Sequence, residues 1–166
     1  MNELIKLVKQ WSIDRGLDKA EPKKQLLKLY EEYGELCAGI AKDNTDLIKD
    51  SIGDMIVVMT ILCQQLGLDM EQVVAGDHDL LEDYWVERDT VEVALYCSNI
   101  LDNFQKHEGG SYKTQDLIDL LFILRLIAIR YDSTVKECLE LAYDEIKGRT
   151  GKMVNGVFVK SQDLKE

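Results

Sequence analysis

A short acidic segment in the first third of the chain has residue types and a spacing that could bind a cation. The segment LYEEYGEL carries Glu31, Glu32 and Glu35 within five positions. In a helix, Glu32 and Glu35 share one face with Gln25 and Lys28, one to two turns earlier. Glu31 points further outward, and we expect it to be solvated.

A second pair of carboxylates lies on the next predicted helix. Asp50 and Asp54 are four residues apart and therefore share a face of that helix. Residues 52–66 are apolar nearly all round, which predicts a helix buried on most sides. An unpaired carboxylate at Asp54 would be costly there, so it must be protonated, paired or bound to a cation. An ion pair with Lys28 is the structural alternative to a cation site.

Oxygen ligands favour hard cations. If Glu32, Glu35 and Asp54 meet, their carboxylates suit Mg²⁺ first, and then Mn²⁺ or Ca²⁺. A di-iron bundle would need Glu-x-x-His pairs, and neither His78 nor His107 follows a glutamate by three residues. We expect both histidines to lie in loops.

The elements that must position these residues are helices. One proline and 11 glycines among 166 residues favour long helices over a fold with many turns. Apolar periodicity predicts helices at residues 2–14, 22–42, 46–66, 69–75, 85–105, 114–131 and 134–147. For the acidic segment GDHDLLED the pattern predicts no definite structure, and the tail reads as a loop with one short extended segment at VFV. The sequence therefore predicts an all-α fold with a four-helix-bundle-like core, in a single domain spanning residues 1–166.

Two shifted alignments favour an internal repeat. A shift of 65 residues places Asp119 on Asp54 and Asp116 on Ser51, and a shift of 60 aligns the helices that precede them. The difference of five residues falls at the loop KHEGGSYK. The repeats would span residues 22–75 and 85–147. Helices of similar period also match by chance, so duplication and coincidence both stay open; duplication would give two hairpins in one four-helix core.

Composition excludes several classes of partner. A net charge of −11 argues against binding to a nucleic-acid backbone, although a bound metal would still allow a small phosphate ligand. The longest apolar run, at residues 55–63, is too short to cross a membrane, and the N-terminus does not resemble a signal peptide. The four cysteines lie on apolar helical faces without a CxxC motif. We expect buried thiols in a soluble, cytoplasmic protein.

Several segments together resemble one enzyme family. EEYGEL on one helix and DSIGD opening the next are similar to the MazG-like nucleotide pyrophosphohydrolases, an all-α superfamily that includes the dimeric dUTPases. WSIDRGL and QLLKLYEE resemble the segment that leads into this motif. AYDEIKGRTGKMVNGVFVK resembles the closing segment of phage-type members. The resemblance covers residues 8–74 and 138–160.

The resemblance implies a site and a reaction. Family members use Mg²⁺ to cleave nucleoside triphosphates between the α- and β-phosphates, which yields a monophosphate and pyrophosphate. Their acidic ligands fall on Glu32, Glu35 and Asp54 of this chain. Glu32 or Glu35 would orient or deprotonate the attacking water. The glutamate of the family's ExxD motif falls on Ser51, which cannot replace a carboxylate.

Three explanations of Ser51 stay open. Asp50 lies one turn before Asp54 and could supply the missing oxygen, directly or through water, which makes it a further candidate metal ligand. Asp116 or Asp119 could instead approach from the second half of the chain. Otherwise hydrolysis is weakened or lost.

Basic and aromatic residues are candidates for substrate binding. The phosphate-binding candidates are Lys28, Lys147, Arg149 and Lys152, and the base-binding candidates are Trp11 and Gln25. The basic cluster at residues 147–152 could also simply complement the dipole of a helix C-terminus. Trp11 lies on an apolar helical face and is also a candidate core residue.

Two functions and a structural alternative follow. The first is Mg²⁺-dependent hydrolysis of nucleoside or deoxynucleoside triphosphates, with Mn²⁺ as a second candidate metal. The second is a regulatory helical module that binds nucleotide or metal with little or no turnover. The third is a structural bundle with solvated acids. The resemblance also implies a homo-oligomer, whereas an internal duplication could replace a partner chain.

Overall fold

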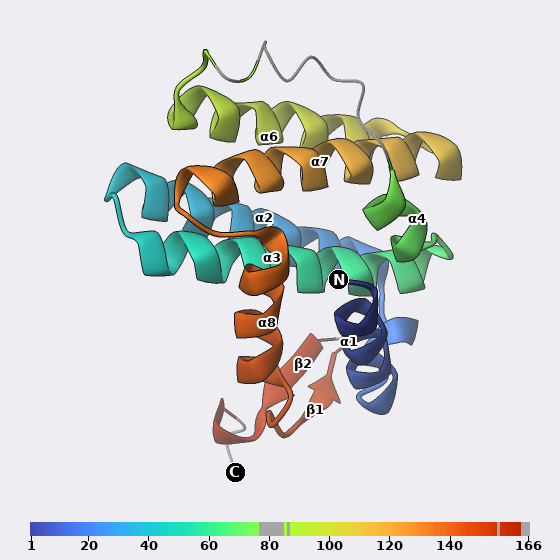
Figure 1. The fold of residues 1–166 in the computed structure, drawn as a ribbon. Helices are drawn as coiled ribbons and strands as arrows, with labels where there is room; N and C mark the ends of the chain where they lie inside the picture. The colour runs from blue at the N-terminus through green and yellow to red at the C-terminus, as the bar shows by residue number, and fades with distance from the viewer. Residues whose placement is uncertain (77–84, 86, 156, 164–166) are drawn as a thin grey trace.

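The computed structural model describes residues 1–76, 85, 87–155 and 157–163 (Figure 1). The helices are α1 (Asn2–Asp14), α2 (Pro22–Ala41), α3 (Thr45–Leu66), α4 (Met70–Ala75), α6 (Thr90–Lys106), α7 (Gly110–Arg130) and α8 (Val135–Ile146), with short 3₁₀ turns η1 (Leu17–Lys19) and η2 (Ser161–Asp163). The strands β1 (Gly151–Val154) and β2 (Val157–Lys160) pair near the C-terminus. The expected all-α fold is confirmed, with one small hairpin added to it.

The helices form layers around α3. Figure 1 shows α6 and α7 side by side above α2 and α3, while α1, α8 and the hairpin lie on the opposite side of that pair. The most extensive packing is that of α3 against α2 and then against α8. Each of the two helical hairpins, α2–α3 and α6–α7, packs its own members closely, which is the arrangement that a four-helix core requires.

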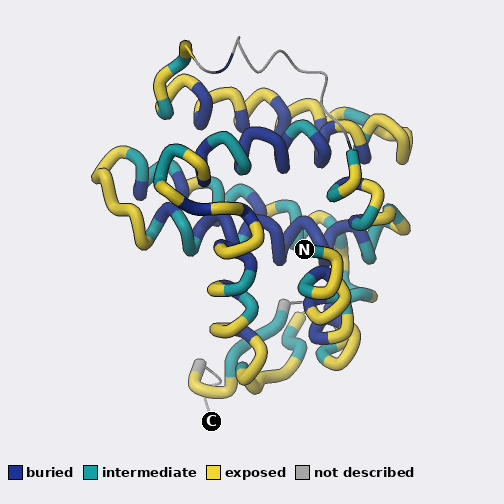
Figure 2. Tube along the Cα trace, viewed as in Figure 1, coloured by how far each residue is buried: buried dark blue, intermediate teal, exposed yellow. Residues whose placement is uncertain are grey.

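Helix α3 is the buried centre of the molecule, as its sequence predicts. Its side chains Met55, Ile56 and Met59 have no exposed surface, and the tube of Figure 2 is dark along most of its length. Asn44 begins the helix by accepting a hydrogen bond from the amide of Leu47, and Gly67 ends it in a left-handed conformation.

Two helices begin at different residues from those expected. Helix α6 starts at Thr90 rather than at Trp85, because Asp89 and Glu92 form a capping box there. That signal is readable in the sequence, and the apolar period alone missed it. Helix α7 starts at Gly110 rather than at Thr114. The glycines of that loop suggested a later start, but the amide of Lys113 donates to the carbonyl oxygen of Gly109 and closes an earlier first turn. The segment GDHDLLED lies mostly outside the described residues.

The C-terminal segment forms a hairpin where the sequence predicts only one extended stretch. Strands β1 and β2 run antiparallel, and Asn155 in the turn has a φ of 51°. The edge of the Phe158 ring meets Trp11 of α1, with 6.0 Å between ring centroids. The Lys24 ammonium donates to the carbonyl oxygen of Asn155. An isolated hairpin is marginal in water, so these contacts with α1 and α2 explain why the strands pair.

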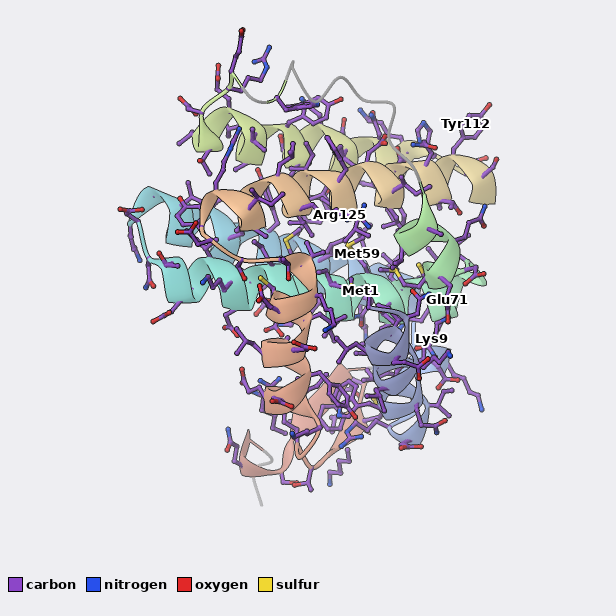
Figure 3. All side chains as sticks on the ribbon, viewed as in Figure 1. Met1, Lys9, Met59, Glu71, Tyr112 and Arg125 are labelled. Atoms are coloured by element: carbon purple, nitrogen blue, oxygen red, sulfur yellow. The ribbon has the colours of Figure 1, made fainter. Side chains whose placement is uncertain are left out.

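The C-terminal half of helix α1 is fixed by contacts with two other helices. Figure 3 shows Lys9 of α1 and Glu71 of α4 pointing toward each other, and the two side chains form an ion pair. Two residues further along, the Trp11 indole N–H donates to the carbonyl oxygen of Ile146, at 2.9 Å. Helix α1 therefore connects α4 to the end of α8.

The cysteines lie on apolar helical faces, and most of them are buried. All four cysteines are free; Cys63, Cys97 and Cys138 are buried, and Cys37 is half-buried. Burial raises the pKa of the Cys63 thiol to about 12, so that it stays protonated. Among the described residues, none of the helices has the length and apolar character needed to span a bilayer.

Gly53 allows α8 to approach α3 closely. A Cβ atom added at Gly53 would lie 2.2 Å from the carbonyl oxygen of Cys138 and 2.8 Å from the Cβ of Ala142. Both of these groups belong to α8, so a side chain at this position would push the two helices apart. In contrast, a Cβ at Gly34 of α2 would meet no atom within 4 Å.

This contrast makes a stability prediction. We expect Gly53→Ala to lower the free energy of unfolding by about 1–3 kcal/mol, because the backbone of α8 must move. Gly34→Ala should instead raise it by about 0.5–1 kcal/mol, since alanine favours the helix and meets no obstacle. Urea unfolding of both variants measures the difference, and a stabilised Gly53→Ala protein would contradict this packing.

Candidate functional site

A large cavity lies beside the buried centre of the fold. It has a volume of about 910 Å³. Its lining comes from α1, α2, α3, the end of α8 and strand β2. The site residues predicted from sequence that line it are Trp11, Gln25, Lys28, Glu32, Glu35, Asp50, Asp54 and Arg149. The structure thus brings most of the predicted set to one place.

The two polar helical faces predicted from sequence both line this cavity. The face of α2 contributes Gln25, Lys28, Glu32 and Glu35. The face of α3 contributes Asp50 and Asp54, followed by apolar side chains further along the helix, Val57, Val58 and Ile61. One end of the cavity is therefore acidic, and the lining becomes apolar toward the C-terminal end of α3.

Glu32 is the most deeply buried of these acids. Only 3% of its side chain is exposed, and its carboxylate forms an ion pair with the Lys28 ammonium, at 2.6 Å. Burial raises the pKa of Glu32 and outweighs the opposing effect of Lys28. Burial lowers the pKa of Lys28. The hydrogen bonds and negative charges of Glu32 and Glu31 raise this pKa by more, so its net change is an increase. The outer residue, Glu31, is exposed and also pairs with Lys28, at 3.1 Å.

The aspartates of α3 face the same cavity under electrostatic strain. Burial raises the pKa of Asp54 to about 7, with further increases from the charges of Glu32 and Asp50. The pKa of Asp50 is also raised, by burial first and then by Glu145 and Glu35. Among the described residues, Asp54 has no ion pair with Lys28 or any other base within salt-bridge distance. These carboxylates repel one another, and a bound cation would relieve that repulsion.

The residue at the departure from the family motif does not face the cavity. Ser51 is fully buried, and its hydroxyl donates to the carbonyl oxygen of Leu47, one turn earlier, at 2.7 Å. Asp116 pairs instead with His107, at 2.6 Å, and Asp119 accepts a hydrogen bond from Gln115. Neither aspartate belongs to the described lining of the cavity. The structure therefore does not support an approach of the second half of the chain to the site.

The end of α8 and the segment that follows it add an acid and a base to the lining of the cavity. Glu145 and Arg149, four residues apart, both line it and form an ion pair. Arg15 of α1 fixes this segment by donating to the Arg149 carbonyl oxygen at 2.6 Å and to the Trp11 carbonyl oxygen at 3.2 Å. Its guanidinium also lies over the Trp11 ring, 4.5 Å from the centroid.

The apolar end of the cavity contains aromatic and amide groups. Trp11 is only 8% exposed, so it serves the core as well as the cavity wall. Phe158 meets it from the hairpin. Gln65, at the end of α3, lines the same region and donates to the carbonyl oxygen of Leu17 at 2.8 Å.

Two predicted phosphate ligands lie elsewhere. Among the described residues, the cavity lining does not include Lys147 or Lys152. The Lys147 ammonium pairs with Asp144, at 2.7 Å, on the exposed side of α8. Lys152 is an exposed residue of β1. The cluster that looks continuous in sequence is divided by the fold, so that only Arg149 faces inward.

Sequence reasoning missed Glu145, Gln65 and Phe158. A usable signal existed only for Glu145, because it lies four residues before Arg149, at the spacing of a helical ion pair. Phe158 lay in a segment expected to be extended, but nothing local showed that it would reach α1.

The donor set has the chemistry of a hard-cation site without being assembled as one. Among the described residues, no three His, Cys, Asp or Glu side chains are arranged closely enough to hold a single ion. The carboxylates of Glu32, Glu35, Asp50 and Asp54 nevertheless all line one cavity, and oxygen donors of this kind fit Mg²⁺ or Mn²⁺. Side-chain rotation would be needed to bring them around one ion.

Comparisons with known proteins indicate the family to which the chain belongs. The model of the MazG nucleotide pyrophosphohydrolase domain matches residues 20–79, which include both acidic faces. The chain is also similar to an uncharacterized 18.2 kDa protein from the rep-hol intergenic region of Haemophilus phage HP1 (strain HP1c1). The two are 32% identical over 161 residues, covering 86% of this chain and 97% of the phage protein. No solved structure matches the chain.

The matched region contains α2, α3 and α4, and it is the part of the chain that supplies Glu32, Glu35, Asp50 and Asp54. The similarity to the phage protein extends over nearly the whole length of that relative. The chain therefore belongs to the MazG nucleotide pyrophosphohydrolase family.

Proposed function

We propose that the protein hydrolyses nucleoside or deoxynucleoside triphosphates to a monophosphate and pyrophosphate, with Mg²⁺ as its cofactor and Mn²⁺ as a substitute. The observation that carries this proposal is the position of Glu32 and Asp54. Each is a carboxylate with a raised pKa, and both face one cavity that also holds Lys28 and Arg149. Family membership supplies the reaction class.

The acidic end of the cavity is the reaction centre in this proposal. Glu32, Glu35, Asp50 and Asp54 would hold the cation, which would neutralise phosphate charge and lower the pKa of water. Either Glu32 or Glu35 orients the attacking water and accepts its proton. Glu35 is the more accessible of the two, because it is exposed whereas Glu32 is buried against Lys28.

The basic side chains bind the phosphates. Lys28 lies at the acidic end with 46% of its side chain exposed. Its ammonium can therefore contact a ligand while it stays paired with Glu32. Arg149 approaches from the end of α8, and its planar guanidinium can bind a phosphate through two hydrogen bonds. A triphosphate between these two side chains has its charge balanced from both sides.

The apolar end binds the nucleoside. Trp11 and Phe158 provide an apolar surface, and the side-chain amides of Gln25 and Gln65 provide groups that can donate to or accept from the edge of a base. Trp11 itself is covered by Arg15 and is mostly buried, so it shapes the wall rather than offering an open face for stacking.

The second candidate function is a regulatory module that binds nucleotide and metal with little or no turnover. Ser51 is the observation in its favour, because its buried hydroxyl cannot act as the acidic ligand of the family motif. The two functions share one cavity and differ only in catalysis.

The products of a turnover assay separate these functions. With Mg²⁺ and each common nucleoside and deoxynucleoside triphosphate, we expect the monophosphate and pyrophosphate, because the proposal places attack between the α- and β-phosphates. Chromatography of the products measures the outcome. Formation of diphosphate and orthophosphate would contradict the proposed reaction. An absence of turnover, together with a rise in Tm that needs both metal and nucleotide, would establish the regulatory module instead.

A single substitution tests the buried acid. We expect Asp54→Asn to lower kcat by about a hundredfold or more, because it removes a charged oxygen donor while keeping the side-chain shape. The matched control is Asp46→Asn, an exposed aspartate in the first turn of the same helix and outside the described lining. The control should keep the activity of the wild type. Full activity in Asp54→Asn would show that the cation site is wrongly placed.

The raised pKa of Asp54 also predicts a pH dependence of stability. From about pH 4 to about pH 7, the folded state retains a proton on Asp54 that the unfolded state has released, so the free energy of unfolding falls as the pH rises. Asp54→Asn removes this loss. In the absence of metal, we expect this variant to match the wild type near pH 4 and to exceed its stability above pH 7 by roughly 2–4 kcal/mol.

Urea unfolding with a chelator present measures this difference at the two pH values. A gap between the two proteins that does not change with pH would mean that Asp54 titrates normally and is not under electrostatic strain.

A further inference from the structure

The starting point is the missing carboxylate of the motif. Ser51 makes its hydrogen bond to its own helix and is buried away from the cavity, so α3 supplies two aspartates and no glutamate. Asp116 and Asp119 do not line the cavity either. A cation held by the remaining acids would lack one of the oxygen donors that the motif provides.

Besides the exposed Glu21 and Glu31, the cavity lining contains one more acid, Glu145, which the fold brings from a different helix. It lines the cavity from the end of α8, and it is one turn along that helix from Ala142. Ala142 and Cys138 form the close contact with Gly53, which is the residue adjacent to Asp54. The packing of α8 on α3 thus places the helical turn that precedes Glu145 against the residue next to Asp54.

The ion pairs of α8 agree with this placement. The Glu145 carboxylate pairs with Arg149, which also lines the cavity. The neighbouring acid, Asp144, faces outward: 70% of its side chain is exposed, and it pairs with Lys147. Only one of the two adjacent acids of α8 is directed to the site.

We propose that Glu145 supplies the carboxylate that Ser51 lacks, binding the divalent cation together with Asp50 and Asp54. This inference rests on the proposed function, because it assigns a further ligand to the same cation site. Glu145 pairs with Arg149 in the structure, so cation binding exchanges one positive partner of Glu145 for another. The exchange releases the Arg149 guanidinium, which then binds a phosphate of the nucleotide. Cation and nucleotide binding therefore favour each other.

The experiment measures binding of Mn²⁺ alone to the full chain, with electron paramagnetic resonance to count free ions. We expect Glu145→Gln to raise the Kd for Mn²⁺ by about tenfold or more. Asp144→Asn is the matched control, because it removes the same charge from the residue directly before Glu145. The Kd of this variant for Mn²⁺ should stay within about twofold of the wild-type value. Glu145 is more than half exposed, so the substitution does not threaten the fold.

A second variant separates a ligand from a distant charge. Glu145→Asp keeps the charge but shortens the side chain by one methylene, so a ligand loses its reach whereas a through-space effect persists. We expect Glu145→Asp to weaken Mn²⁺ binding nearly as much as Glu145→Gln does. Wild-type affinity in either Glu145 variant would overturn the assignment.

The same titration separates this inference from the proposed function. Asp54→Asn should lose Mn²⁺ binding. If it binds Mn²⁺ as the wild type does, the cation site as a whole is wrong. If Asp54→Asn fails to bind while Glu145→Gln binds normally, only the role of Glu145 is overturned, and its function is to hold Arg149.

Discussion

The close packing of α8 on α3 at Gly53 is the constraint on which the candidate site depends. A side chain at Gly53 would collide with the backbone of Cys138, so the two helices approach as closely as their main chains allow. This contact lies in the buried middle of α3, next to the face on which Asp50 and Asp54 line the cavity. It also brings the end of α8, with Glu145 and Arg149, to the edge of that cavity. Stability and site geometry thus share one contact.

The site has a high electrostatic cost in the absence of a cation. Lys28 neutralises part of the charge of Glu32, and Arg149 pairs with Glu145, but Asp54 is left half-buried with raised pKa among like charges. Proteins rarely retain buried charges of one sign unless a ligand compensates them. The same carboxylates that weaken the metal-free fold are therefore well suited to bind a divalent cation. In the proposed reaction this binding would combine stability and catalysis in one group of residues.

The remaining elements act as supports for this centre. Helix α1 and the C-terminal hairpin form the apolar wall, and they are held by hydrogen bonds from Trp11 and Arg15 to the carbonyl oxygens of Ile146 and Arg149. The hairpin α6–α7 covers the other side of α2 and α3 and takes no part in the described lining. Its acids are used differently, as the pair of Asp116 with His107 shows. The two halves of the chain have similar helical hairpins, but only the first supplies the site.

The sequence by itself determined the helices and the two acidic faces, because both depend on residues three or four apart. The helical period places Glu32 and Glu35 on one face of α2, and Asp50 and Asp54 on one face of α3. The burial of α3 follows from its nearly continuous apolar surface. Only the tertiary structure decided that Ser51 turns away, that Lys147 and Lys152 lie outside the cavity and that Glu145 lines it. These outcomes depend on how α8 and the hairpin pack on elements more than 80 residues earlier in the chain. No local pattern specifies such contacts, since they are set by the fit of whole helices to one another.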